Sequence, residues 1–375
     1  MGKWDSRLRE KSIAVQHLKS KKTEDLLKAK KFMTDLLELR NVDKLYKTYV
    51  QGVKKSIAYN EKNKVFVDFR MEGTTSGRLS CAGYKNGKNP MGASFHTLPR
   101  EKVNNIRNSF VAPQDWVFVQ ADYSAMELRV LAHLSKEENM RKAFREGLDL
   151  HTYSAQLTFK QDKITKEQRQ LAKTTSFLIV YGGGAFNLSQ TFGMSVEEAQ
   201  RIIDSYFEAF PGIPSYMDFI SDHILEHEYA YTIFGRRRHL VDVRSKENKV
   251  VKRALRQGIN FTIQSTASDV LLVAMISIAL EMEKLGMKGF PVATVHDSIE
   301  IVCPKDEVQD TLAIMRKHMV EYPVIKDVFG IDFEVPLEIE AEIGPSFGKA
   351  KAVGYNEFGM PIITKEELDE AVYLG

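Results

Sequence analysis

Hydrophobic positions change their period several times along the chain, and each change marks a different kind of element. Residues 5–57 are rich in Lys, Leu and Glu and contain no Pro, which predicts helices. From Val65 hydrophobic and polar residues alternate, as on a strand. Residues 136–230 and 246–287 again favour helices, and residues 291–303 alternate as a hairpin. Strands, a long helical insertion and further strands together predict an α+β fold.

The first candidate for chemistry lies where a predicted strand meets a predicted helix. Hydrophobic residues alternate up to Asp122, and Ser124 with Glu127 has the spacing of a helix-capping box. An Asp at such a junction is held rigidly and faces outward. This position suits a ligand of Mg²⁺, which takes one or two carboxylates together with substrate phosphates. Taken alone, an ordinary turn aspartate is the commoner interpretation.

A second candidate is a stripe of two cations and two aromatic residues on one predicted helix. Arg169, Lys173, Phe177 and Tyr181 recur at every fourth position, which places them along one face. The cations could clamp a triphosphate and the aromatic rings could stack on a base. The alternative is a solvated basic turn followed by aromatic residues of the core.

The third candidate is the tip of the predicted hairpin, His296-Asp297. Aspartates are common in turns, so a functional interpretation needs a partner carboxylate within reach of a shared metal site. Two-metal sites hold their ions roughly 3.5–4 Å apart and stabilise both oxygens of an in-line phosphoryl displacement. Asp122 is separated from Asp297 by 175 positions, so only the fold could bring the two together.

Composition and charge indicate where the protein is located and what kind of partner it has. The chain is 43% hydrophobic and 27% charged, has two cysteines, and shows neither a signal peptide nor an apolar run of the length that a membrane span needs. We therefore expect a cytoplasmic protein with no membrane partner. Residues 1–70 carry 18 Lys and Arg against 9 Asp and Glu, a net charge of +9. The other 305 residues carry 35 Lys and Arg against 41 Asp and Glu, a net charge of −6. The basic N-terminal segment therefore indicates either a partner with a phosphate backbone or an ordinary solvated helical face.

Six sequence segments in order carry a resemblance to a known family. The segments are TSGRLS, DYSAMELRVLAHLS, RQLAKTTSFLIVYG, FGRRR, RQGINFTIQ and VHDS, within residues 35–350. The chain resembles family A DNA polymerases, the relatives of bacterial DNA polymerase I. This resemblance implies a right-hand polymerase fold, with an antiparallel palm sheet and large helical fingers. It also implies addition of deoxynucleoside triphosphates to a primer 3′ end on primer–template DNA.

The resemblance implies a role for each matching residue. Two Mg²⁺ ions would be held by Asp122, Asp297 and the carbonyl of Tyr123. Residues that match nucleotide contacts are His151, Arg169, Lys173, Phe177, Tyr181 and the ribose gate Glu127. Residues that match DNA contacts are Arg78, Arg236, Arg237, Arg256, Asn260, Gln264 and His296. Several features depart from the family pattern. Ser298 replaces the usual Glu, which predicts altered metal affinity, and three glycines follow Tyr181, which should loosen the end of that helix.

The same resemblance suggests how the chain is divided. We expect a basic, truncated thumb-like segment over residues 1–64, palm over 65–135, fingers over 136–262, palm again over 263–350, and a polar, loosely attached tail over 351–375. The segment before the palm is too short for a proofreading exonuclease or a full thumb. We therefore expect no proofreading, and either a split polymerase with the missing parts on a separate chain or a fragmentary gene product. We also expect a bacteriophage source, with the protein in the bacterial host cytoplasm.

Two other functions compete with this one. A single-subunit RNA polymerase shares the palm, but it should not keep a gate such as Glu127 against ribose, and comparing deoxynucleotide with ribonucleotide incorporation separates the two. A primer–template binding protein without catalysis is compatible with the short thumb and with Ser298. Tight duplex binding without primer extension would favour that alternative.

Overall fold

The computed structural model describes residues 23–60, 63–90, 92–99, 106–356 and 359–372. The chain forms two compact units: residues 1–68 together with 81–99, and residues 69–80 together with 100–375. The predicted helix over residues 5–22 lies outside the described residues.

The first unit is built on consecutive helical segments. Helix α2 (Thr23–Lys44) continues through a π-helical stretch, Leu45–Val50, into α3 (Gln51–Asn60). Helix α3 and the π-helical stretch are tied to a loop of the same unit, because the Tyr49 hydroxyl donates to the Thr97 carbonyl (2.5 Å) and the Ser56 hydroxyl to the Gly92 carbonyl (3.0 Å). The helical prediction therefore holds over the described part of this segment. The short strands β3 (Lys85–Asn86) and β4 (Asn89–Pro90) belong to this unit, whereas β1 (Val67–Arg70) and β2 (Ser80–Gly83) each include residues of both units.

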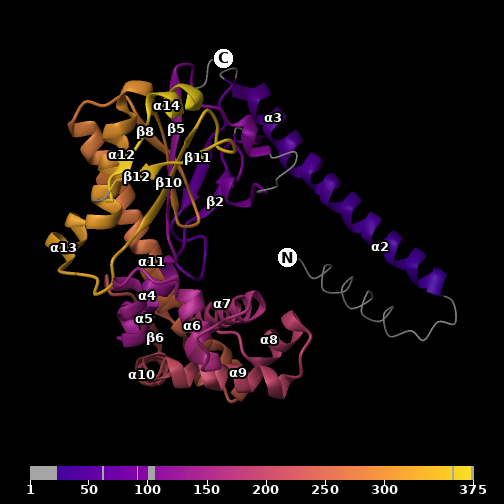
Figure 1. The fold of residues 1–375 in the computed structure, drawn as a ribbon. Coiled ribbons are helices and arrows are strands. Elements are labelled where there is room, and N and C mark those ends of the chain that lie inside the picture. Colours follow the sequence, from indigo (N-terminus) through magenta and orange to yellow (C-terminus); the bar gives the residue numbers. More distant parts are fainter. Residues whose placement is uncertain (1–22, 61–62, 91, 100–105, 357–358, 373–375) are drawn as a thin grey trace. The chain divides into compact units, whose positions relative to one another are not determined.

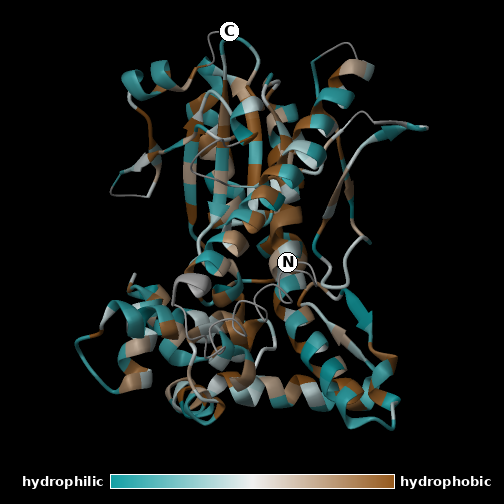
Figure 2. Ribbon diagram, turned by 90° about the vertical axis from the view of Figure 1, so that its right-hand side faces the viewer, coloured by the Kyte–Doolittle hydropathy of each residue, from teal (hydrophilic) through white to brown (hydrophobic). Residues whose placement is uncertain are grey.

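A five-stranded antiparallel sheet forms the centre of the second unit. Its order is β11 (Lys351–Ala352), β10 (Ile339–Gly344), β5 (Trp116–Tyr123), β9 (Ser298–Pro304) and β8 (Phe290–Val295). On β5 the side chains of Val117, Val119 and Ala121 are fully buried, and Figure 2 shows hydrophobic and hydrophilic colours alternating along the sheet. One face of β5 therefore belongs to the core and the other is left for polar side chains.

The long helix α11 (Asn248–Lys284) packs on β8 and β9 of this sheet and also against α4 (Met126–Ser135). Helix α11 is long and apolar enough to cross a membrane, although the sequence showed no unbroken apolar run; 56% of its apolar window is buried inside the protein. It supplies Ile263, Val270 and Ile278 to the main core, so we interpret it as a core helix. The boundary expected between residues 262 and 263 falls within α11.

Short helices gather at one end of the sheet, as Figure 1 shows. They are α5 (Glu138–Arg145), α6 (Leu150–Phe159), α7 (Lys166–Val180), α8 (Ala185–Phe192), α9 (Val196–Ala209) and α10 (Gly212–His227), followed by the strand pair β6 (Tyr229–Tyr231) and β7 (Arg237–His239). This is the helical insertion that the sequence predicted.

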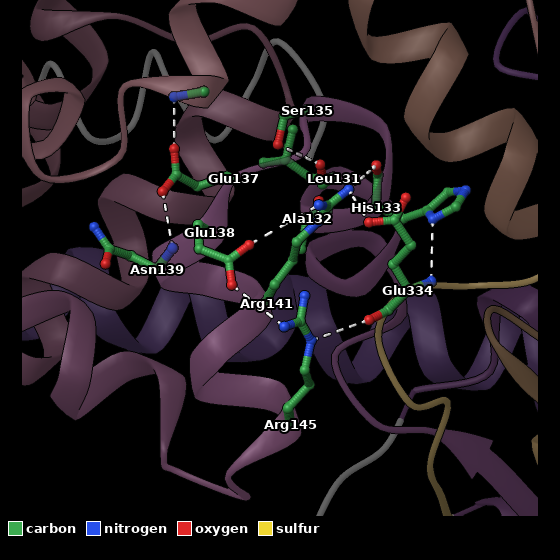
Figure 3. A network of polar contacts seen from close by, with 11 residues as sticks. Leu131, Ala132, His133, Ser135, Glu137, Glu138, Asn139, Arg141, Arg145 and Glu334 are labelled. Atoms are coloured by element: carbon green, nitrogen blue, oxygen red, sulfur yellow. Dashed lines mark hydrogen bonds and ion pairs between the residues drawn. The ribbon is translucent and has the colours of Figure 1, made fainter.

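Buried charges fix the start of this helical part, as Figure 3 shows. One carboxylate oxygen of Glu137 accepts from the amide of Asn139, capping α5 at 3.0 Å, and the other accepts from the amide of Gly212, at 2.5 Å. Arg141 pairs with Glu334 at 2.5 Å, and its Nε donates to the carbonyl of Ala132. Helices α4, α5 and α10 are thereby held to one another and to the segment that precedes β10.

The C-terminal segment is attached more firmly than its polar sequence predicted. Strand β11 pairs with β10, and Ala371 and Val372 are buried in the main core. The expectation of a loose tail is therefore wrong for residues 351–356 and 359–372, because this segment carries apolar residues that complete the core at the sheet edge. The remaining elements are α12 (Val308–Arg316), α13 (Pro323–Phe329), β12 (Gly354–Tyr355), β13 (Pro361–Ile362) and α14 (Lys365–Ala371).

Candidate active site

The pairing of β5 with β9 brings the two predicted metal-binding aspartates to the same end of neighbouring strands. Asp122 lies opposite Ser298 in the antiparallel register, and the amide of Tyr123 donates to the carbonyl of Asp297 at 3.2 Å. His296 and Asp297 form the two-residue turn between β8 and β9, and the φ angle of His296 is 61°. The hairpin that the sequence predicted, with the aspartate at its tip, is confirmed.

The donor set at this end of the sheet suits a hard cation. The Asp122 side chain is exposed, Asp297 is partly exposed, and the Tyr123 backbone lies beside both. Within the described part of the chain, no three His, Cys, Asp or Glu side chains are grouped to hold a metal ion by themselves. Mg²⁺ needs no such cage, because it takes one or two carboxylates and completes its shell with water and substrate phosphates. The residues therefore fit the predicted Mg²⁺ ions, and metal binding stays a prediction.

Beside the aspartates, polar residues of three strands line one cavity of about 270 Å³. Asp122 has Glu340 and Ser298 as its neighbours across the sheet, and Gln120 has Glu342 and Glu300. Since residues two apart on a strand share a face, all six positions face the same side.

Glu300 is the residue in this cavity that the sequence reasoning missed. Its side chain is 2% exposed, one carboxyl oxygen lies 2.6 Å from the Ser298 hydroxyl, and the other has no hydrogen-bond partner. The pKa of Glu300 is raised to about 8, mainly by burial; the Ser298 hydrogen bond lowers this pKa and the charge of Asp122 raises it. The sequence did contain a signal for this residue, because Glu300 interrupts the apolar run of β9.

Glu127 does not cap helix α4, contrary to the capping-box prediction. The N-cap residue of α4 is Ala125, in the left-handed conformation at φ 50°, and no side chain caps the helix. The Glu127 carboxylate instead accepts from Arg78 at 2.6 Å and from the Tyr181 hydroxyl at 2.7 Å. Burial raises the pKa of Glu127, while Arg78 and the Tyr181 hydrogen bond lower it. The partners that determine its position come from other elements, which a local spacing rule cannot see.

Arg78 links this carboxylate to the hairpin. Its guanidinium also contacts Asp297, at 3.3 Å. The side chain of Gln264, on α11, is buried beside Glu127 and lowers its pKa. One cluster therefore holds Arg78, Glu127, Tyr181, Gln264 and Asp297, all of which the resemblance assigned to the site.

The predicted stripe of cations and aromatic rings is present on α7. Thr165 caps the helix in a capping box with Gln168. Phe177 lies between His151 and Tyr181, with ring centroids 5.9 Å and 6.5 Å away. Neither aromatic residue belongs to the closed core, because Tyr181 is 51% exposed and Phe177 is partly exposed.

Two cavities adjoin this stripe. One, of about 410 Å³, is lined by Ser124 and Ala125 next to Asp122 and by His151, Lys173 and Phe177 from the helices. The other, of about 500 Å³, is lined by Lys173, Phe177 and Tyr181 among others. Burial, and then the charge of Lys173, lower the pKa of His151 to about 4, so the imidazole is neutral at physiological pH. Lys173 lines both cavities. Its positive charge therefore lies between the first cavity and the aromatic residues at the end of α7.

The glycines after Tyr181 close helix α7 rather than loosening it. Gly182 has a φ of 70°, its amide donates to the carbonyl of Ile179, and the amide of Gly183 donates to that of Leu178 at 2.8 Å. This pattern is a Schellman C-cap, which satisfies the last carbonyl groups of a helix. Asn260 adds a bond from its side-chain amide to the carbonyl of Val180. The predicted loosening is therefore wrong for this helix end.

The predicted DNA-binding residues differ in how far their donors are already engaged. Arg256 and Arg237 are exposed, and Arg237 lies over the ring of Tyr229. His296 is also exposed, but it takes part in an interaction within the protein. Arg236 instead donates to the carbonyls of Gly77 and Ser265 and pairs with Asp269. The geometry gives Arg236 a structural role, while the DNA contacts of all these residues stay predictions.

Comparison with known proteins now places the chain. A family model described as DNA polymerase family A matches residues 6–349. The chain belongs to DNA polymerase family A. It is 34% identical over 326 residues to DNA polymerase I of Chloroflexus aurantiacus, covering 86% of this chain and 33% of that protein. It is 34% identical over 321 residues to DNA polymerase I of Bacillus subtilis, covering 84% and 34%. The chain thus spans about a third of the length of these relatives.

A solved structure agrees with the family A assignment. The POL domain of Pol1 from M. smegmatis, in complex with DNA primer-template and dNTP, aligns with a TM-score of 0.76 and 28% identity over 90% of this chain and 56% of that one. The predicted α+β polymerase fold is therefore confirmed. The relatives named here do not support the predicted bacteriophage source.

Proposed function

We propose that this family A chain is a template-directed DNA polymerase that adds deoxynucleoside triphosphates to a primer 3′ end. The observation that carries the proposal is the β5–β9 register, which places Asp122 beside the Asp297 hairpin next to a cavity lined by Lys173 and His151. Phosphoryl transfer needs mainly positioning and charge stabilisation, and these elements supply both.

Each part of the site has a task in this reaction. Two Mg²⁺ ions held by Asp122, Asp297 and the Tyr123 carbonyl would offset the triphosphate charge and activate the primer hydroxyl. Lys173 and Arg169 bind the triphosphate, and Phe177 and Tyr181 pack against the sugar and base. Glu127, held by Arg78 and Tyr181, occupies the place that a ribose 2′-hydroxyl would need. These residues position the nucleotide and select its sugar.

Primer extension with Asp122→Asn and Asp297→Asn tests the proposal. Each change removes a carboxylate charge with little change of shape, and we expect the extension rate to fall at least about a thousandfold, or about 4 kcal/mol of barrier. Glu370→Gln, which removes an exposed ion pair with Lys351, is the matched control and should extend normally. Anisotropy of labelled primer–template shows whether binding survives. Normal extension by either aspartate variant would sink the two-metal assignment.

We propose further that this chain itself does not proofread. The site residues serve nucleotide addition, and none of them is assigned to 3′ excision. We propose that a separate chain carries the exonuclease or the thumb. Incubating the protein with a 3′-mismatched primer and Mg²⁺, without nucleotides, should leave the primer intact. Metal-dependent shortening of that primer would refute the idea.

A further inference from the structure

Asp149 holds the guanidinium of Arg169 from the side. One carboxylate oxygen of Asp149 lies 2.7 Å from Arg169 Nε, and the other lies 2.8 Å from Nη2. The Thr152 hydroxyl adds a third contact to Nε, at 3.2 Å. The pKa of Asp149 is held well below its usual range, mainly by this bond to Arg169, so the pair is ionised at neutral pH.

This side-on contact leaves the other edge of the guanidinium available. Arg169 carries five N–H donors, and a planar fork of two nitrogens can bind a phosphate in bidentate fashion. Asp149 uses the Nε edge, so Nη1 and the outer hydrogen of Nη2 remain. In the described part of the chain, no other hydrogen bond or ion pair of Arg169 is found. The Arg169 side chain is 42% exposed, so a ligand can reach it.

The same carboxylate also fixes the start of the neighbouring helix. Asp149 is the N-cap of α6, and its side chain accepts from the amide of Thr152 at 3.1 Å. His151 lies in the first turn of α6, and Asp149 and His151 line the same cavity as Lys173. One side chain therefore sets the relative position of two groups that come from different helices.

We propose that Asp149 is a positioning residue for triphosphate binding, which orients the Arg169 fork toward the phosphates and fixes His151 in the same frame. The inference rests on the proposed polymerase function. A free arginine side chain must lose much rotational freedom on binding, and an arginine already held on one edge loses less. The gain should appear in the affinity for the triphosphate rather than in the chemical step.

Asp149→Ser and Asp149→Asn separate the two tasks of this residue. Ser and Asn are good N-caps, so α6 keeps its cap, while the ionised grip on Arg169 is lost. We expect KM for the incoming nucleotide to rise roughly tenfold with a smaller change in kcat, since the lost contact orders the binding group. Glu370→Gln again serves as the control for loss of an exposed ion pair. Circular dichroism melts verify that each variant is folded.

A double-mutant cycle decides whether Asp149 acts through Arg169. In an Arg169→Ala background, Asp149→Ser should raise KM no further, because the group that it positions is gone. Equal effects of Asp149→Ser in the two backgrounds would overturn the proposal, as would an unchanged KM in the single variant.

A binding measurement separates this proposal from the polymerase function. Inorganic tripolyphosphate is titrated into the DNA-free protein by calorimetry. Wild type should bind it, and Asp149→Ser and Arg169→Ala should weaken binding to a similar degree. Wild-type binding with no extension would contradict the polymerase function and leave Asp149 supported. Binding that is equally strong in wild type and Asp149→Ser would contradict the role of Asp149, even if the protein extends primers.

Discussion

Glu300 is a carboxyl group enclosed by the protein, next to Asp122, Glu342 and Arg107 in one cavity. The Ser298 hydroxyl has one proton, yet it lies within hydrogen-bond distance of both the Val295 carbonyl and Glu300. Both contacts are satisfied when Glu300 is protonated and donates to the hydroxyl, which in turn donates to Val295. A neutral Glu300 is therefore the form that this surrounding favours.

Stability of the metal-free protein should consequently decrease as pH rises. The pKa of Glu300 is about 8 in the folded protein, above the usual 4.5, so its contribution is complete below pH 4.5 and is lost as pH rises through 8. The free energy of unfolding should fall by up to about 1.4 kcal/mol per pH unit over this window from this group. Urea unfolding between pH 5 and 8 should show a shallower fall for Glu300→Gln than for wild type. Identical slopes would mean that Glu300 does not titrate as described.

Single residues also show where sequence reasoning reaches its limit. Asp122, Asp297 and the α7 stripe were identified because motif order and spacing are local or family-wide properties. The true partners of Glu127 and Arg169 were not, because Arg78, Tyr181 and Asp149 reach them from other elements. The sequence was sufficient to identify the site residues. Their hydrogen-bond and ion-pair partners could be identified only from the fold.

At the level of elements, the C-terminal end of helix α7 determines where Tyr181 lies. Its C-cap places Tyr181 at the point where the chain turns away, with the hydroxyl on Glu127. The run of three glycines suggested flexibility, because composition does not distinguish a glycine that provides a left-handed cap from one that merely loosens the chain. The hairpin between β8 and β9, by contrast, was predictable because alternation and a polar two-residue turn are sufficient to specify it.

Replacing Gly182 with Ala should destabilise the protein by about 1 kcal/mol, because Ala disfavours the left-handed conformation. An added Cβ would also lie 3.1 Å from the Cβ of Arg256. Gly52→Ala is the control: Gly52 lies within helix α3 and no atom lies within 4 Å of the new Cβ, so the change should be neutral or stabilise the protein by up to about 1 kcal/mol. Urea unfolding measures both. Equal destabilisation by the two variants would contradict the assigned role of Gly182.

For the whole molecule, the uneven charge distribution bears on how DNA would be held. The first 70 residues carry a net charge of +9 and the rest a net charge of −6. Lys28, Lys30 and Lys31 are exposed on α2. Each lysine that meets a phosphate releases condensed counterions when DNA binds, so binding through this segment depends on salt.

Changing Lys28, Lys30 and Lys31 to Gln should therefore weaken primer–template binding and flatten its salt dependence. The slope of log K against log salt should fall in magnitude by up to about 2.7, or about 0.9 per phosphate contact. Fluorescence anisotropy across a salt series measures the slope. The control variant carries Gln at Lys142, Lys284 and Lys365, which removes the same charge from exposed positions of the other unit. A slope change as large in the control would show that net charge alone is responsible.

The central position of β5 has a consequence for synthesis of the protein. Both neighbours of β5 in the sheet, β9 and β10, begin at Ser298 and Ile339, well over a hundred residues after β5 ends. At roughly 5–20 residues per second, a ribosome needs on the order of 10–40 seconds to produce them. Throughout that interval an apolar strand emerges with both edges unpaired, and Asp122 has no Asp297 beside it. The nascent chain therefore lacks the paired aspartates and is prone to aggregation until β9 and β10 have been made.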